Sequence, residues 1–227
     1  MKPIAPTPGR AEQAYQTLLD EICAGALAAG THLVQEELAA KLGVSRQPVQ
    51  QALALLRSDG LVEEIGTRGL RVTALDPAAM RQHYEIRDAL DVLAVRRAAA
   101  RAAADRATAA TIAARGGDLI AAGRAAVEEA SVDRQVRCDV DFHNFLYEAS
   151  GNALLALTAE PHWRYLRRVM AAVLRHAEPG AAIWQQHADI LAAVLAGDAD
   201  GAARLAHQHI DGAAERLAGV LNRSLAP

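Results

Sequence analysis

Four side chains that commonly bind metals lie in the C-terminal two-thirds of the chain, at spacings that could bring them together. Asp139 and His143 are four residues apart in a segment of helical periodicity, so they share one face and could chelate one ion. His187 and His209 each lie 11 residues from Asp198, which falls in a turn predicted between two antiparallel helices. Residues equidistant from such a turn lie level with each other, so the two imidazoles could meet.

The two later histidines also lie on the apolar stripes of their predicted helices and would therefore point inward. A single histidine is more often an ordinary core or surface residue than a ligand, and we interpret His32, His83, His162 and His176 in that way. Four inward-pointing groups are different, because a buried carboxylate needs a cation or strong donors. The set Asp139, His143, His187 and His209 predicts one divalent transition metal per chain, and its donors suit Zn, Ni, Mn or Fe without selecting among them.

A second group of polar side chains opens a helix predicted in the N-terminal part. Ser45 is a good N-cap, and Arg46 could bind guanine or a phosphate. Three glutamines follow that could bond to base edges: Gln47, Gln50 and Gln51. Arg68, beside Gly69 in a predicted hairpin loop, could lie in or near a minor groove. The pattern favours a DNA-reading helix over its alternative, a small helical domain with a solvated polar face.

The elements predicted around these groups give a mainly α fold in two parts. Residues 11–74 read as a winged helix-turn-helix, with helices at 12–28, 35–42 and 45–60 and short strands at 61–65 and 70–73. Residues 75–80 are the expected linker, with Asp76 as a helix N-cap, and residues 1–10, which contain three prolines, are expected to be disordered. Residues 81–224 read as an all-α bundle of about six helices. Its helical stretches are 77–104, 106–129, 132–149, 152–176, 180–196 and 199–222, with a break at Gly116-Gly117.

Composition fits two soluble domains in a cytoplasmic protein. Of the 227 residues, 52% are hydrophobic and 22% charged, and we find neither a membrane-spanning run nor a secretory signal. The two cysteines, Cys23 and Cys138, fall in different predicted domains and are expected to be reduced and buried. Residues 1–75 hold seven Lys or Arg against eight Asp or Glu, so DNA binding must rely on local positive charge presented twice by a homodimer.

The N-terminal motifs resemble the DNA-binding domain of the GntR family. The resemblance rests on residues 33–49, on the Leu- and Ala-rich run ending in Asp59-Gly-Leu-Val62, and on Arg68-Gly69. In that family Arg-Glu usually follows the Pro-Val pair, and this arginine contacts DNA, whereas this chain has Gln50-Gln51. The resemblance therefore implies a shared fold and a role in binding double-stranded operator DNA, but a different operator preference.

The C-terminal motifs are similar to the FCD domain, the FadR-type effector domain of the same family. They are Asp139-Val-Asp-Phe-His143, Ser150-Gly-Asn152, His187 and His209. The resemblance implies that the one Asp and three His bind a metal whose open positions meet a small carboxylate effector. Arg87 matches an arginine common on the first helix of this domain and could bind that carboxylate bidentately. From the sequence alone, an exposed helix-surface arginine is an equally good interpretation.

These observations predict a transcription regulator, in the family's habit a repressor, whose operator binding responds to the effector. One alternative is a regulator whose metal is structural or is itself the signal, without an organic effector. The other is a metal-dependent hydrolase, since an open metal site could activate water. The sequence shows no well-placed general base, nucleophile motif or glycine-rich phosphate loop, so we expect no enzymatic activity.

Overall fold

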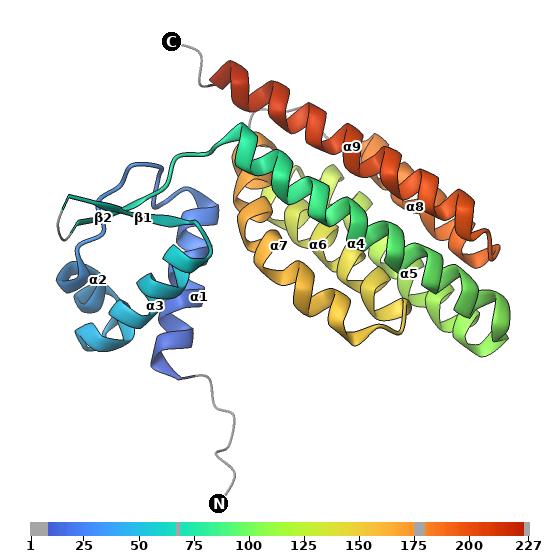
Figure 1. The fold of residues 1–227 in the computed structure, drawn as a ribbon, viewed down its shortest axis with the longest axis horizontal. Helices are drawn as coiled ribbons and strands as arrows, with labels where there is room; N and C mark the ends of the chain where they lie inside the picture. Colours follow the sequence, from blue (N-terminus) through green and yellow to red (C-terminus); the bar gives the residue numbers. More distant parts are fainter. Residues whose placement is uncertain (1–8, 67–68, 175–179, 225–227) are drawn as a thin grey trace, which may run out of the picture. The chain divides into compact units, whose positions relative to one another are not determined.

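A computed structural model describes residues 9–66, 69–174 and 180–224. The chain divides into two compact units, residues 1–75 and 76–227, each with its own core. Helices dominate both units, and one two-stranded antiparallel sheet lies in the first (Figure 1). This confirms the predicted fold class, a winged helix-turn-helix followed by a helical bundle.

The N-terminal unit has the element order of a winged helix. Its helices and strands are α1 (Arg10–Ala24), α2 (Gln35–Leu42), α3 (Arg46–Ser58), β1 (Val62–Ile65) and β2 (Gly69–Val72). Val49, Leu53 and Leu56 recur at helical spacing and bury one face of α3, which packs against α1 and α2. Gly43 ends α2 at φ 64°, a left-handed conformation that permits the tight turn into α3.

Three local expectations for this region need correction. The helix α1 begins at Arg10, inside the stretch predicted to be disordered, and ends at Ala24, four residues early, because Gly25 turns left-handed at φ 76°. Ser45 occupies the N-cap position of α3, but its side chain makes no capping hydrogen bond. Residues 77–80, assigned to the linker although a helix was predicted from residue 77, form the first turn of that helix. There the Asp76 carboxylate accepts a hydrogen bond from the Ala78 N–H at 2.8 Å, as the N-cap prediction required.

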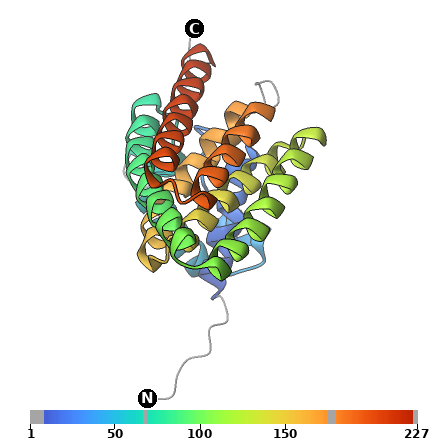
Figure 2. The same ribbon diagram turned by 90° about the vertical axis from the view of Figure 1, so that its right-hand side faces the viewer.

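Six helices form the described part of the C-terminal unit. They are α4 (Pro77–Ala104), α5 (Arg106–Glu128), α6 (Val132–Ala149), α7 (Ala153–Leu174), α8 (Ala181–Leu195) and α9 (Ala199–Ser224). Figures 1 and 2 both show α9 running alongside α4, which also contacts α6, α7 and α8. The long helix α4 therefore supplies side chains to the centre of the bundle.

The break predicted at Gly116-Gly117 is wrong, because α5 continues through both residues. Gly116 is buried against α8, where an added Cβ would lie 2.7 Å from Leu191 Cδ2. One heptad later, a Cβ on Gly123 would lie 2.0 Å from Trp184 Cζ2. These two glycines let α5 approach its neighbour closely and do not interrupt the helix, whereas Gly117 faces open space.

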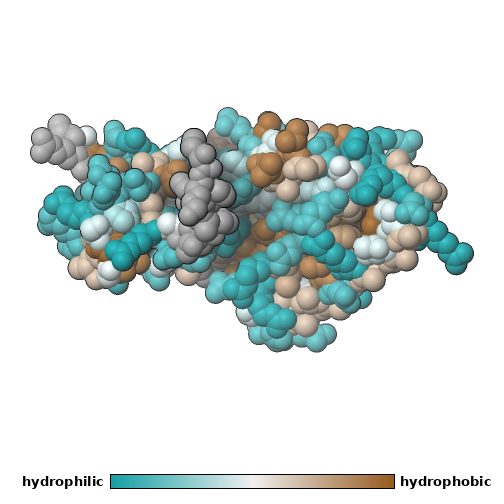
Figure 3. Space-filling model, turned by 90° about the horizontal axis from the view of Figure 1, so that it is seen from below, coloured by the Kyte–Doolittle hydropathy of each residue, from teal (hydrophilic) through white to brown (hydrophobic). Residues whose placement is uncertain are grey.

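Hydrophilic residues cover most of the face drawn in Figure 3, with hydrophobic residues in separate patches between them. Within the described ranges, no helix is both long and apolar enough to cross a membrane. Cys23 and Cys138 are half-buried, so they are less enclosed than expected.

Candidate metal centre and DNA-binding surface

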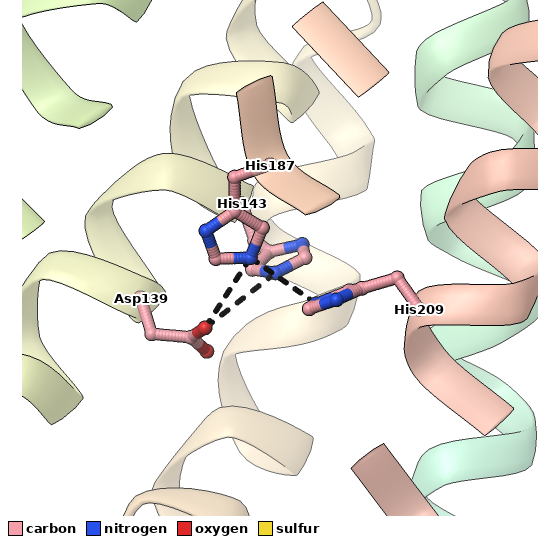
Figure 4. Close-up of side chains that lie close together, drawn as sticks. All are labelled: Asp139, His143, His187 and His209. Atoms are coloured by element: carbon pink, nitrogen blue, oxygen red, sulfur yellow. Dashed lines mark hydrogen bonds and ion pairs between the residues drawn. The ribbon is translucent and has the colours of Figure 1, made fainter. Parts of the chain in front are cut away.

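The helices α6, α8 and α9 bring the four predicted ligands together inside the bundle (Figure 4). His187 Nε2 lies 3.1 Å from His209 Nε2 and 3.5 Å from Asp139 Oδ1. His143 Nε2 lies 4.0 Å from the same carboxylate oxygen. One ligand atom from each residue lies within 4.8 Å of all the others, which is close enough for one ion to be shared.

Burial sets the protonation of these groups. All four are buried, and His187 is 0% exposed. Burial lowers the pKa of His143, His187 and His209 well below 6.5, so the imidazoles are neutral and each keeps a lone pair. Burial also raises the pKa of Asp139 to about 6, although the nearby Arg87 guanidinium opposes this shift.

The unsatisfied atoms of the cluster fit a metal ion. Among the described residues, neither His143 Nε2 nor Asp139 Oδ2 has a hydrogen-bond partner, although both atoms are buried. A buried acceptor without a partner costs about 1–3 kcal/mol. Three neutral imidazoles and one carboxylate form a donor set that suits Zn, Ni, Mn or Fe, so the residues present fit the predicted ion.

Two neighbouring side chains lie against the imidazoles. Gln186 Oε1 forms a hydrogen bond with His209 Nδ1 at 2.9 Å, and a partner of this kind selects the tautomer and turns the other ring nitrogen toward the ion. Asp91 Oδ2 approaches His143 Nδ1 to 3.0 Å without hydrogen-bond geometry, so it places a negative charge beside the ring. The sequence reasoning missed both residues. Asp91 could have been found, because it lies one helical turn after Arg87 on the same face of α4.

Arg87 lies beside the metal cluster and is only 2% exposed, so the exposed-arginine interpretation is wrong. Its Nε donates to Asp91 Oδ2 at 3.3 Å, and its Nη2 lies 3.7 Å from Asp139 Oδ2. The guanidinium also stacks over the Trp163 ring, 4.1 Å from the ring centroid. With Asp91 and Asp139 both ionised, one cation and two carboxylates give this buried group a net charge of about −1, which a divalent ion would convert to about +1.

A cavity of about 660 Å³ opens next to the cluster, entirely within the C-terminal unit. Arg87, Asp139 and His209 form part of its wall, together with Tyr84 and side chains of α7, α8 and α9. The Tyr84 hydroxyl is buried, and its burial raises the pKa of the phenol to about 12, so it stays protonated as a donor. The cavity therefore offers a ligand direct access to the ion-binding groups.

In the N-terminal unit, α3 presents the predicted DNA-contacting side chains on one exposed face. Val49 and Ala52 are 0% exposed on the opposite face. The exposed residues are Ser45, Arg46, Gln47, Gln50 and Gln51. A helix with one buried face and a polar face near its N-terminus has the form of a major-groove reading helix.

The local positive charge on this surface is paired with acidic side chains. Arg46 Nη1 lies 2.8 Å from Glu36 Oε1, and Arg57 forms an ion pair with Glu64. Exposed pairs such as these contribute only about 0–1 kcal/mol, so a phosphate can replace the carboxylate. Arg68 lies outside the described residues. Gly69 begins β2 opposite Ile65, and an added Cβ would lie 2.8 Å from the Ile65 carbonyl oxygen, so this strand pair needs glycine there.

Comparisons with known proteins agree with both halves of the structure. Residues 10–72 match the model of the gntR family of bacterial regulatory proteins, and residues 82–212 match the FCD domain. The HTH-type transcriptional regulator YdfH of Escherichia coli is 29% identical over 93% of this chain and 90% of its own length. The HTH-type transcriptional repressor RspR of E. coli K12 is 28% identical over the same shares of the two chains.

Solved structures show the same fold. The E. coli protein McbR/YncC superimposes with a TM-score of 0.77, covering 97% of this chain and 100% of that chain at 19% identity. A structure from Rhodococcus sp. RHA1, described as a transcriptional regulator GntR, gives a TM-score of 0.73 over 92% and 98% of the two chains at 22% identity.

Proposed function

Because the chain belongs to the GntR family of transcription regulators and carries an FCD domain, we propose that it is a homodimeric repressor whose operator binding is weakened by a carboxylate effector at its metal centre. The family and the relatives are transcription regulators, not enzymes.

The observation that carries the proposal is a buried metal-ligand cluster that opens onto a cavity beside a buried arginine. Arg87, Asp139 and His209 all line that cavity, so a ligand there can touch the ion and the guanidinium together. When bound, the divalent ion would supply Lewis acidity and make the centre attractive to an anion. Arg87 would hold the carboxylate, while the hydrogen bond to Asp91 and the ring of Trp163 keep its guanidinium in place.

On the DNA side, we assign base contacts to the exposed glutamines of α3, and a phosphate or guanine contact to Arg46 at its N-terminus. Arg46 would exchange Glu36 for a phosphate or a guanine, and Gln47, Gln50 and Gln51 would reach base edges. Within the described part of the N-terminal unit, Arg46 and Arg57 are each paired with a carboxylate, so two copies on a nearly palindromic site are needed for useful affinity. A homodimer meets that need.

The effector acts through linkage between its site and the operator. A ligand can weaken DNA binding only by preferring an arrangement of the two DNA-binding domains that does not fit the operator. A coupling of about 1–3 kcal/mol, typical of such linkage, would change operator affinity about 5- to 150-fold.

Elemental analysis of the untagged protein tests the metal centre. We expect about one transition metal per chain in the parent, and none in Asp139→Ala or His187→Ala. His207→Ala is the matched control, because His207 is exposed, lies two residues from His209 and contacts Asp88 instead. A parent without metal after reconstitution, or a His207 variant that loses metal like the others, would contradict the proposal.

A further inference from the structure

The cavity beside the metal cluster is much larger than a small acid requires. Its volume is about 660 Å³, in the range of sites that hold drug-sized ligands, whereas an acid of two to four carbons fills only a small part of such a space. It follows α9 from His209 to Arg223, a rise of about 20 Å along the helix. The ligand that fits this space has a body extending well beyond its metal-binding group.

The walls away from the cluster are mostly apolar. The apolar side chains come from three helices, α7, α8 and α9, and the polar Glu215, Arg216 and Arg223 of α9 line the same part of the cavity. The apolar residues are Met170, Val173, Leu174, Ala182, Ile183, Trp184, Ala213, Leu217 and Val220. Apolar surface of this kind gains free energy when it is covered by an apolar ligand and loses water. A polar ligand body would give up its own hydration against these apolar side chains and would find partners only at the exposed Glu215, Arg216 and Arg223.

The buried charges match one carboxylate. Arg87, Asp91 and Asp139 together with a divalent ion leave an excess of about one positive charge, which a single carboxylate neutralises. A second carboxylate attached to the same ligand would lie among the apolar walls unless it reached Arg216 or Arg223. Arg216 and Arg223 also line the cavity, but both are exposed and hydrated without a ligand, and Glu215 beside them offsets part of their charge.

From this arrangement we propose that the effector is a monocarboxylic acid with a bulky apolar body, such as a medium-chain or aryl-alkyl acid. This inference rests on the proposed function, since it assigns the ligand of the same site. The carboxylate lies between Arg87 and the ion-binding residues, and the apolar body lies along α9 between Leu217 and Ile183. Small hydroxy acids would leave most of the cavity unfilled. Tricarboxylates would place charge against its apolar walls.

Isothermal titration of the metal-reconstituted, full-length protein with a homologous series tests the assignment. The probes are acetate, butanoate, hexanoate and octanoate, with octanedioate and citrate for comparison. Each added methylene should tighten binding about fourfold, the gain expected from burying one such group. Octanoate should therefore bind much more tightly than acetate, and octanedioate more weakly than octanoate.

A variant that fills the far end of the cavity gives an independent readout. Val220→Trp should weaken octanoate binding at least tenfold and leave butanoate binding and metal content unchanged. Ala110→Trp, at an exposed position on α5 outside the cavity, is the control and should change neither.

The outcomes separate this inference from the proposed function. If citrate or octanedioate binds the metal-loaded protein more tightly than octanoate, or if affinity does not rise along the series, the apolar-acid assignment is wrong while a carboxylate sensor stands. If no acid binds the metal-loaded protein, both proposals fail.

Discussion

Replacing Gly123 with alanine tests whether the close approach of α5 to α8 supports the metal centre. An added Cβ would lie 2.0 Å from Trp184 Cζ2, far inside van der Waals contact. The Trp184 ring is 2% exposed, so it has little room to move away. It also packs edge-on against His187, with ring centroids 4.7 Å apart, so any displacement reaches a predicted metal ligand.

The expected magnitude follows from two opposing effects. Glycine to alanine inside a helix gains about 1 kcal/mol from propensity. Overpacking a tight core costs about 1–3 kcal/mol, and a contact this short against a buried ring takes the upper end of that range. Gly123→Ala should therefore lower the free energy of unfolding by about 2 kcal/mol. Gly117→Ala, six residues earlier on the open face of the same helix, meets nothing within 4 Å and should raise it by up to about 1 kcal/mol.

Urea denaturation followed by tryptophan fluorescence measures this difference directly. Both tryptophans, Trp163 and Trp184, lie in the C-terminal unit, so the signal reports the unit that carries the mutations. Metal content measured in parallel should fall in Gly123→Ala and stay at the parent level in Gly117→Ala. If Gly123→Ala is as stable as Gly117→Ala, the packing argument is refuted.

Three further predictions concern the metal centre and the DNA-reading helix. Asp91→Asn should weaken metal binding about 10- to 100-fold in chelator competition, because it removes a negative charge 3.0 Å from the His143 ring, and unchanged affinity would count against that contribution. The free energy of unfolding of the metal-free protein, measured in urea, should fall as pH drops below about 6.5. The reason is that the imidazoles of His143, His187 and His209 are buried and neutral, and they take up three protons on unfolding. This uptake exceeds the protons that the two buried carboxyls, Asp91 and Asp139, can release. Each net proton is worth roughly 1.4 kcal/mol per pH unit, and a gain in stability on acidification would contradict the burial. Gln50→Arg should steepen the salt dependence of operator binding by about one unit of slope per subunit, and an unchanged slope would exclude a phosphate contact there.

Helix boundaries in the C-terminal unit were largely predictable because their signals are local. Asp76 followed by Pro77 marks the start of α4, and α4 and α6 match their predicted ranges end to end. The prediction of a break at Gly116-Gly117 was wrong because a glycine can either interrupt a helix or let another helix pack closely against it. Only the position of Leu191 on another helix decides between the two.

In the candidate site, too, some features were predictable from the sequence and others depend on packing between helices. The equal spacing of His187 and His209 about Asp198 can be read from the sequence, and their Nε2 atoms lie 3.1 Å apart, as that spacing predicted. The burial of Arg87 could not be read from α4 alone, because Trp163 and Asp139, on two other helices, enclose it. The apolar cavity is likewise a property of the packed bundle, since its walls come from separate helices.

Operator binding by the full-length protein, measured by fluorescence anisotropy with and without octanoate, tests the central claim most directly. The metal-loaded protein should release operator DNA about 5- to 150-fold more readily when the acid is present, and the chelated protein and His187→Ala should bind operator but ignore the acid. An equal response to the acid with and without metal would contradict the account.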